Sequence, residues 1–516
     1  MPDRPFRIRA ASGGRRVAAL LVAVTVTVVA ACASGDDAAP GTGDAGPSDS
    51  VAVDRSATPV TGTGGADTTE APEAATAIEA AVTRCAPAAS GTDDEVTTLR
   101  IWHGFDGDAI GFFEEVVAGF ESEHPGIDVE VTQFNGSYTD GLEELAALDP
   151  AERPDVFMGS NSAVRLQHDS GLFVPPSECT GGAVPDALVD LLPIIEHTYT
   201  VDGTLVAAPY NVSTAVMMYD RKLWRAAGVD PDDPPATFDE LESVVRQLRD
   251  SGAAASGMVL YDRAASWLVE QTAAQEGRLL VAENNGRDGT GVSEVMFDDA
   301  VAVATLERFR VLHREGYVLW AGINQSGRDD LLQLADTAQP SGLTLHTSAS
   351  IGDALRIIES GVIGAGIEVG AAPLPGNAPG GLVGGGSWWL LAQDDAARVG
   401  AAWTLVDWLI QPDRVAALAA FTGYVPTTER AAASPVTLER WAQEPAFRVG
   451  YDQLAAMPAT ATAAGLQVGP MVEVQRALEV AASSAINADL DPAEQLRIAE
   501  GTARSVLDAY DAVYGD

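Results

Sequence analysis

The chain has 516 residues, of which 46% are hydrophobic and 20% charged, a composition typical of a globular protein rather than a disordered one. This length allows two or three domains with full cores. The formal net charge of −43 excludes functions that need a basic surface, such as binding to nucleic acid or to an anionic membrane through basic patches.

The N-terminal segment has the pattern of an export signal. Five arginines between Arg4 and Arg16 precede the apolar run VAALLVAVTVTVVAA at residues 17–31, which is shorter than the about 20 residues of a membrane span. The run ends in VAAC, which resembles a bacterial lipobox, where the cysteine is acylated and becomes the mature N-terminus. We therefore expect a lipoprotein signal peptide at residues 1–31 and lipidation at Cys32. A plain signal peptide with an incidental cysteine is the alternative.

Residues 32–95 are expected to form a disordered linker after the lipidated cysteine. The segment is dominated by small and polar residues without a sustained apolar period, so it cannot bury enough surface to order itself. A flexible coil of this length would give the folded part a reach of roughly 45 Å from the membrane. Cys85 and Cys179 remain, and in an exported protein they are a candidate disulfide, with two unpaired thiols as the alternative.

From Val96 onward, strand and helix patterns alternate along the chain. TLRIW, IDVEVTQF and PDVFMGS have the patterns of strands, and the segment between the first two carries an apolar helical stripe that ends at Pro125. Later helices have clear starts, because Thr237 and Glu240 form a capping box and Asp491 is a cap. This alternation predicts an α/β fold with a parallel layer.

Two features indicate where a ligand would bind. Glycine- and proline-rich breaks at residues 207–210 and 370–387 are suitable crossings between two lobes. The stretch WHGFDGD at residues 102–108 directly follows a strand, and open α/β sheets bind ligands at the carboxyl ends of their strands. We therefore expect the polar groups of this stretch at the mouth of a binding site.

Catalytic motifs are scarce in the sequence. It contains no phosphate-binding GxxxxGK[ST], no GxSxG and no HExxH, and its six histidines lack the spacing of metal ligands. Asp106 and Asp108 could form a carboxylate pair, so a surface glycosidase is an alternative of another class. His103 could serve in catalysis, as a hydrogen-bonding pocket residue or in a structural role. We expect no enzyme activity, no cofactor and no metal.

The loops are instead rich in aromatic and small polar side chains. Pockets for small polar ligands combine aromatic walls with a few placed hydrogen-bonding groups, and sugars suit such a lining. The candidates at strand-to-loop junctions are Trp102, Tyr138, Tyr210, Asn211, Ser213, Trp267, Ser387, Trp388 and Tyr424.

Several segments together resemble one known family. They are WHGFDGD with FESEHPGIDVEV, RPDVFMGS, APYNVSTAVMMYDRKLWRAAGVDPDDPPATFDEL, GGGSWWLLAQ and FTGYVPTTERAA. From Val96 to the C-terminus the chain resembles the extracellular solute-binding proteins of ABC importers, family 1, which carry maltose, other sugars and glycerol-3-phosphate. The resemblance implies an α/β, two-lobed, periplasmic-binding-protein-like fold of type II, with lobes joined by crossing hinge segments. The expected N-terminal lobe is residues 96–208 plus 371–411, and the C-terminal lobe is residues 209–370 plus 412–516.

The longest of these segments is most similar to the branch that binds glycerol phosphates, and two residues depart from that branch. Gln467 stands where the branch has an arginine, and Thr139 where it has a glutamate. Glutamine cannot reproduce the charge and bidentate fork that arginine offers to phosphate. We therefore expect a neutral sugar, with glycerol-3-phosphate or a glycerophosphodiester as the alternative. The expected ligand-binding residues are Trp102, Asp106, Tyr138, Ser213, Trp267, Gly386, Ser387, Tyr424 and Gln467.

The resemblance also implies the partners. We expect an exported, monomeric lipoprotein on the outer face of the cell membrane or in the periplasm. It would capture a small polar solute and deliver it to an ABC permease that a separate ATPase drives. A sensor or adhesion lipoprotein of the same fold without a permease is a further alternative.

Overall fold

The computed structural model describes residues 84–86, 96–134, 136–289, 291–322, 329–336, 338–361 and 366–515. The expected signal peptide, Cys32 and most of the expected linker lie outside these residues. Among the helices of the described part, none combines the length and the apolar character needed to cross a bilayer.

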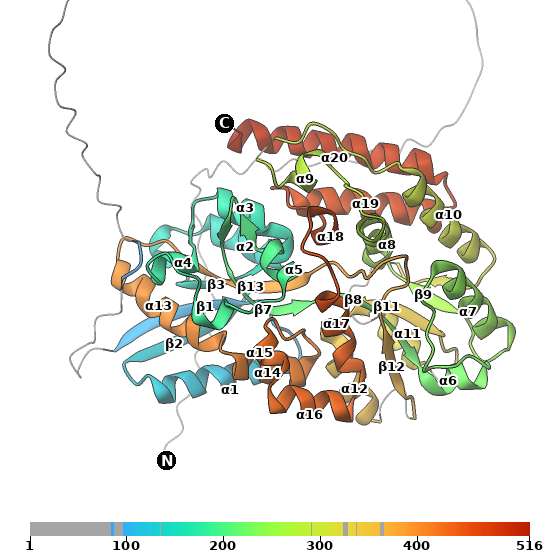
Figure 1. The fold of residues 1–516 in the computed structure, drawn as a ribbon, viewed down its shortest axis with the longest axis horizontal. Coiled ribbons are helices and arrows are strands. Elements are labelled where there is room, and N and C mark those ends of the chain that lie inside the picture. Colours follow the sequence, from blue (N-terminus) through green and yellow to red (C-terminus); the bar gives the residue numbers. More distant parts are fainter. Residues whose placement is uncertain are drawn as a thin grey trace, which may run out of the picture. The chain divides into compact units, whose positions relative to one another are not determined.

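The first lobe is built on a mixed six-stranded sheet (Figure 1), whose strands are β1 (Thr97–His103), β2 (Ile127–Gln133), β3 (Val156–Ser160), β4 (Phe173–Val174), β7 (Ala208–Ser213) and β13 (Gly384–Leu391). They follow the order β2-β1-β3-β13-β4, and β7 also pairs with β13. β1 runs parallel to β2 and β3, whereas β13 runs antiparallel to β3, β4 and β7. β3 is buried along almost its whole length, as expected for a central strand covered on both faces.

The helices and short strands of the first lobe are α1 (Asp108–Glu123), α2 (Tyr138–Ala147), α3 (Val164–Asp169), α4 (Pro176–Cys179), α5 (Pro193–Thr198), β5 (Thr200–Val201), β6 (Thr204–Leu205), α13 (Ala396–Leu409), α14 (Pro412–Thr422) and α15 (Glu429–Ala432), with 3₁₀ turns at Pro150–Glu152, Asn161–Ala163 and Asp186–Leu188. Phe120 of α1 and Leu405 of α13 are fully buried and share one core with Phe157, Trp388 and Trp389 of the sheet. Burial of such large apolar side chains is the main stabilising contribution to this lobe.

The second lobe is built on a five-stranded sheet in the order β10-β9-β11-β8-β12, with strands β8 (Ala215–Asp220), β9 (Met258–Leu260), β10 (Val318–Trp320), β11 (Leu343–Thr347) and β12 (Val369–Ala372). Its helices are α6 (Arg221–Ala226), α7 (Phe238–Asp250), α8 (Asp262–Gln275), α9 (Ala282–Gly286), α10 (Ala300–Arg314), α11 (Asp329–Ala335), α12 (Ile351–Glu359), α19 (Met471–Ile486) and α20 (Pro492–Tyr514), with a 3₁₀ turn at Ser348–Ser350. Helices α8, α10, α19 and α20 gather beside one another (Figure 1). The remaining helices are α16 (Pro435–Gln443), α17 (Ala446–Ala455) and α18 (Ala461–Ala464).

The predicted helix starts are confirmed. The Thr237 side chain accepts a hydrogen bond from the Glu240 backbone N–H, and the Glu240 side chain accepts one from the Thr237 N–H, which completes the capping box of α7. At the start of α20, the Asp491 side chain accepts from the Glu494 N–H. α9 is different, because three of its residues have φ near +55° and form a left-handed turn.

The two-lobed α/β fold with crossing segments is confirmed, and three passages between the lobes lie within the described residues. The first passage is at Thr214, between β7 and β8, and the second is the segment 373–383, between β12 and β13. The third passage is at Gly465, because Ala464 packs in the core of the first lobe and Leu466 packs in the core of the second lobe. The passages lie beyond the expected lobe boundaries at residues 208, 370 and 411, and helices α14, α15 and α18 pack on the first core.

Candidate functional site

A cavity of about 1010 Å³ lies between the two lobes. Its first-lobe wall consists of residues 104–106 after β1, residues 137–140 at the start of α2, and residues 160–162 after β3. Its second-lobe wall is formed chiefly by α8, α19 and residues 346–353. Because β1 and β3 are parallel neighbours, their carboxyl ends bring these polar loops to one edge of the sheet.

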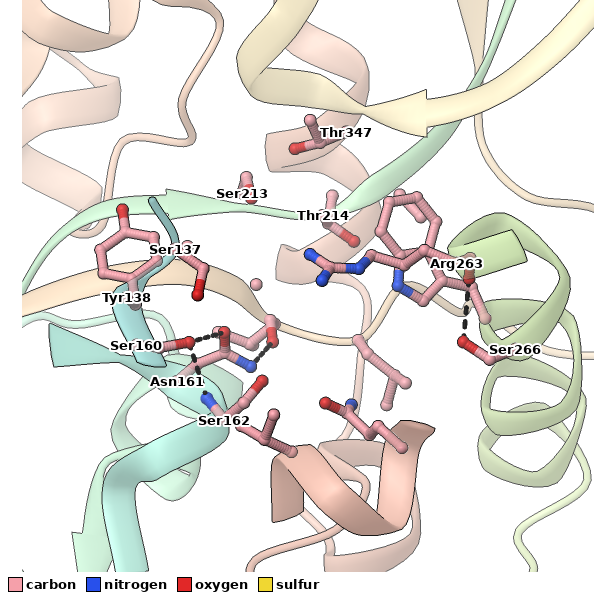
Figure 2. A pocket seen from close by; sticks show the side chains of 18 of the residues that line it. Ser137, Tyr138, Ser160, Asn161, Ser162, Ser213, Thr214, Arg263, Ser266 and Thr347 are labelled. Carbon is pink, nitrogen blue, oxygen red and sulfur yellow. Dashed lines mark hydrogen bonds between the residues drawn. The ribbon is translucent and has the colours of Figure 1, made fainter. Parts of the chain in front are cut away.

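The crossing strands form the base of this cavity. Figure 2 shows Ser213 and Thr214 on the crossing strand, with Tyr138 and Ser160 of the first lobe on one side and Arg263 of α8 on the other. Small hydroxyl side chains at the crossing leave room for a ligand and offer both donors and acceptors.

Tyr138 and Tyr424 supply aromatic surface and neutral hydroxyls. The Tyr138 hydroxyl accepts a hydrogen bond from Nδ2 of Asn211 at 2.8 Å. A Cβ at Gly386 would lie 3.2 Å from the Tyr138 ring, so the absence of a side chain there lets the ring approach the sheet. Burial raises the pKa of both tyrosines above their usual range, which keeps the phenols protonated as hydrogen-bond donors.

Carboxylates outnumber cations on the cavity walls. The two arginines that line it are Arg263 and Arg476, against six acidic residues, which are Asp106, Asp140, Asp262, Glu270, Asp353 and Glu479. Nε of Arg263 also lies 3.4 Å from a carboxylate oxygen of Glu479, which partly neutralises this arginine. The field in the cavity therefore opposes an anionic solute and is compatible with a neutral, hydroxyl-rich one.

Glu270 is a buried carboxyl group on the α8 wall. Its side chain is 1% exposed, and Nε2 of Gln475 donates to its Oε2 at 3.0 Å. Burial raises the pKa of Glu270 to about 7, because the charged form is separated from water. This group therefore changes its protonation near neutral pH.

Gln467 lines the cavity with its amide nitrogen already bound. Nε2 donates to the backbone carbonyls of Thr198 at 3.0 Å and Thr200 at 3.1 Å, both in the first lobe. The Gln467 backbone N–H donates to the carbonyl of Asn285, in the left-handed turn of the second lobe, at 2.9 Å. The side chain thus joins the two lobes, and its donor group is used by the protein itself.

No group of His, Cys, Asp and Glu side chains in the described part of the chain is arranged to hold a metal ion. The cavity offers hydroxyls, carboxylates, amides and aromatic rings, which are the groups that bind polar organic solutes.

A family comparison agrees with this architecture. The model of the family "bacterial extracellular solute-binding protein" matches residues 115–449. The chain belongs to this family. The resemblance expected from the sequence motifs is thereby confirmed, and the relatives of this solute-binding protein are themselves binding proteins.

Two curated relatives share one name. The sn-glycerol-3-phosphate-binding periplasmic protein UgpB of Escherichia coli K12 is 24% identical over 416 residues, which cover 75% of this chain and 86% of the relative. The protein of that name from Yersinia pestis bv. Antiqua is 24% identical over 403 residues, which cover 74% of this chain and 86% of the relative.

Solved structures of two classes of binding protein share the fold. UgpB from Mycobacterium tuberculosis in complex with glycerophosphocholine has a TM-score of 0.66 at 20% identity, covering 80% of this chain and 98% of that one. The cyclic α-maltosyl-1,6-maltose binding protein from Arthrobacter globiformis has a TM-score of 0.64 at 21% identity, covering 80% and 100%. At such identities the likeness shows the fold alone.

The structure brings most of the predicted ligand-binding residues of this solute-binding protein to the cavity, namely Asp106, Tyr138, Ser213, Trp267, Tyr424 and Gln467. Asp106 is exposed there, and Trp267 is half-buried, with its ring edge against Tyr261. Gly386 and Ser387 lie outside the cavity lining, because both belong to the buried middle of β13. The Ser387 hydroxyl accepts a hydrogen bond from Nε1 of Trp389 within the core.

Trp102 also lies outside the lining, although it opens the WHGFDGD stretch. Side chains alternate along β1, and Trp102 packs against the first core on the other side from Leu99, Ile101 and His103. His103 is 1% exposed, and its Nδ1 accepts a hydrogen bond from the Phe105 backbone N–H at 3.1 Å. Burial lowers the pKa of His103 to about 4, which fits the structural role among the three that the sequence left open.

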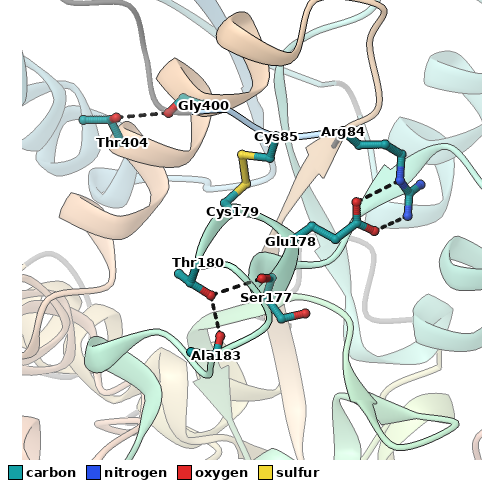
Figure 3. Close-up of a disulfide and its surroundings, with 9 residues drawn as sticks. All are labelled: Arg84, Cys85, Ser177, Glu178, Cys179, Thr180, Ala183, Gly400 and Thr404. Atoms are coloured by element: carbon teal, nitrogen blue, oxygen red, sulfur yellow. Dashed lines mark hydrogen bonds and ion pairs between the residues drawn. A yellow bond between two sulfur atoms is a disulfide. The ribbon is translucent and has the colours of Figure 1, made fainter. Parts of the chain in front are cut away.

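Cys85 and Cys179, which are separated by 94 positions in the sequence, form a disulfide (Figure 3). Two further contacts hold the same segment on the first lobe, because Arg84 bonds to Glu178 and the Ala86 N–H donates to the Ala396 carbonyl at 2.9 Å. The bridge thus ties the segment before β1 to the end of α4.

Several lining residues were missed from the sequence. Ser160 ends β3 and Asn161 and Ser162 follow it, so the rule about carboxyl ends of strands that pointed to WHGFDGD could have found them. Arg263 and Glu479 have no such local signal, since they lie on two helices far apart in sequence and meet only through packing.

Proposed function

We propose that this solute-binding protein is the substrate-binding component of an ABC importer and that its solute is a neutral sugar. The solute would bind in the cavity between the lobes and stabilise a closed form that contacts it from both sides. A permease driven by a separate ATPase would then receive it.

The observation that carries the sugar proposal is the combination of aromatic rings with an excess of carboxylates around the cavity. Sugar C–H faces pack on rings such as Tyr138, Trp267 and Tyr424, while hydroxyl groups donate to carboxylates. Gln467 adds to this argument, because its amide donors are bound to Thr198 and Thr200 and are not available to a phosphate.

A glycerol phosphate is the second candidate. The curated relatives are named for glycerol-3-phosphate, and Arg263 faces the cavity with 66% of its side chain exposed. An arginine fork at this position would suit a phosphate if the loose pair with Glu479 opened. A glycerophosphodiester with a cationic head group would also suit the acidic wall.

We further propose that the protein acts as a monomer outside the cytoplasm, held by a lipid on Cys32 to the outer face of the cell membrane. This rests on the sequence of residues 1–32, with its arginines, apolar run and VAAC. Exported and anchored in this way, the cavity would sample external solutes beside the permease.

A thermal-shift screen tests the choice of solute. The protein would be melted with maltose, maltotriose and other neutral sugars in one set, and with glycerol-3-phosphate and glycerophosphocholine in a second set. A ligand that binds only the folded state raises the melting temperature, by an amount corresponding to about 2.7 kcal/mol at a hundredfold excess over Kd. Shifts confined to the sugars support the proposal.

The opposite pattern, with shifts confined to the phosphates, would replace it with the second candidate. An Asp106→Asn variant extends the screen, since it removes one hydroxyl acceptor that faces the cavity. A sugar that donates to Asp106 should lose about tenfold in affinity, equivalent to 1.4 kcal/mol. Release of a cleaved product by the wild-type protein would instead support a glycosidase.

A further inference from the structure

Arg356 of α12 joins the two lobes at one end of the cavity. Its Nε donates to Oδ2 of Asp108 at 2.9 Å, its Nη1 donates to the carbonyl of Phe421 at 2.9 Å, and its Nη2 donates to Asp353. Asp108 begins α1 and Phe421 lies near the end of α14, so two of the three partners belong to the first lobe. The third partner, Asp353, lies on α12 itself.

Aromatic packing holds the guanidinium in place. Its central carbon lies 4.4 Å from the centre of the Phe421 ring, and that ring stacks on Phe112 of α1 at 4.7 Å. The Arg356 side chain is 27% exposed. A planar guanidinium bound along three directions and stacked on a ring cannot be replaced by the point charge of a lysine without loss.

The partners of Arg356 lead directly into the cavity. Asp353 lines it from the second lobe, and Asp106, two residues before Asp108, lines it from the first lobe. Tyr424 lines the same cavity, and the charges of both Asp106 and Asp353 help to raise the pKa of its phenol, after the larger effect of burial. One arginine thus connects the backbone segments that carry two carboxylates on opposite walls.

We infer that Arg356 is a positioning residue of the solute site, which sets the separation of Asp106 and Asp353 across the lobes so that both accept hydrogen bonds from one solute. The inference rests on the proposed function as far as the solute is concerned. The interlobe contact itself is independent of which solute binds. It also gives a role to Asp108, which lies outside the cavity lining.

The test compares Arg356→Gln, Arg356→Lys and the control Arg448→Gln. Arg448 is an equally charged, exposed arginine whose partner, Asp452, lies one turn away on the same helix α17, so its loss leaves the interlobe contact intact. Two spin labels report the distance between the lobes by double electron–electron resonance. They are attached at Asp128→Cys in the first lobe and Asp233→Cys in the second, in a Cys32→Ser background. Calorimetry with maltotriose as the probe reports affinity.

Without solute, Arg356→Gln should broaden and shift the interlobe distance distribution, Arg356→Lys should fall between it and the wild type, and Arg448→Gln should match the wild type. Maltotriose affinity should fall about fivefold in Arg356→Gln, the lower end of the usual range for coupling between sites. Raising the salt concentration should lower the maltotriose affinity of the wild type toward that of Arg356→Gln, because the Asp108 side of the contact is exposed and therefore screened by salt.

An unchanged distance distribution in Arg356→Gln would overturn the inference, as would an equal change in Arg448→Gln. If Arg356→Gln fails to fold, Asp108→Asn removes the same interlobe contact from the other side and is judged by the same distances. If maltotriose does not bind the wild type, a neutral sugar that raises the melting temperature replaces it as the probe, failure of every such sugar defeats the sugar proposal, and the distances still decide the role of Arg356.

Discussion

Gln467 lines the ligand cavity, but its side-chain amide bonds to the other lobe and holds the two lobes together. Its Nε2 bonds to two carbonyls of the first lobe, while its neighbours Leu466 and Val468 pack in the core of the second. The side chain is 4% exposed. Gln467 therefore lines the cavity without adding a charge, and its amide holds the two lobes together.

Replacing Gln467 by alanine should lower the free energy of unfolding by about 2 kcal/mol, because two buried carbonyls would lose their donor. Urea unfolding measures this change. The control is Gln443→Ala, whose exposed amide bonds only to Glu439 and which should change stability by less than about 0.5 kcal/mol. A Gln467→Arg variant tests whether this position can reach the solute. If the variant gains glycerol-3-phosphate binding, the side chain at position 467 can still face the solute.

Glu270 gives the stability a defined dependence on pH. Its pKa is about 7 in the folded protein, raised by burial above the 4.5 of a free glutamate, so the folded state holds a proton that the unfolded state has lost between these values. Stability should therefore fall as pH rises from 4.5 to 7, by roughly 3 kcal/mol in total for this one group. Glu479 and Arg263 are the charged neighbours, and they shift the midpoint in opposite directions.

The measurement is the melting temperature between pH 4 and 8 for the wild type, Glu270→Gln and Glu473→Gln. Glu270→Gln should flatten the decline above pH 4.5, because the amide cannot ionise. Glu473 is exposed on the same wall helix, α19, so its variant should keep the wild-type slope. Equal slopes in all three proteins would show that Glu270 does not titrate in this window.

At the level of elements, the left-handed turn in α9 is the most strained part of the described chain. Glu283, Asn284 and Asn285 all have φ between 52° and 58°, a region that costs an ordinary residue about 1–2 kcal/mol. Asn285 compensates through its side chain, which accepts from the backbone N–H groups of Leu280 and Val281 and donates to the Ala461 carbonyl. Its own carbonyl accepts from Gln467, so the turn supports the third passage between the lobes.

Asn285→Ala should therefore destabilise the protein by about 3 kcal/mol, through lost buried hydrogen bonds and a backbone conformation that alanine tolerates less well. Asn284→Ala is the matched control, since Asn284 has the same backbone conformation but an exposed side chain that bonds to Asp288. Chemical denaturation of the two variants separates the contributions. Equal losses would assign the effect to the backbone conformation rather than to the buried amide.

Elements with local signals were predictable from the sequence. The capping box of Thr237 and Glu240 involves residues three apart, and the alternation in β1 is visible in seven residues. The asparagines at 284 and 285 tolerate positive φ, but this local preference does not predict three consecutive residues in that conformation, which is held by contacts with Ala461 and Gln467 far along the chain. A local pattern cannot report such partners.

At the scale of the whole molecule, the same distinction applies to the site. The family motifs and the strand-end rule were enough to find the cavity, the two tyrosines and Asp106. Three of the predicted ligand-binding residues, Trp102, Gly386 and Ser387, lie outside the lining, because a residue near a strand end can face either the cavity or the core, and only packing decides which. The passages between the lobes differ from the expected boundaries for a similar reason. Helices α14, α15 and α18 come after the expected boundary at residue 411, and they still pack on the core of the first lobe.

The disulfide between Cys85 and Cys179 has a mechanical consequence. Everything that precedes residue 84 is attached to the first lobe at α4, so a pull on the N-terminal side is borne by that lobe and the second lobe carries no load. Reduction of the bridge would leave the segment around Cys85 held on the first lobe by the Arg84–Glu178 and Ala86–Ala396 contacts. Neither the bridge nor these contacts share a residue with the cavity lining, so loss of the bridge would leave that lining unchanged.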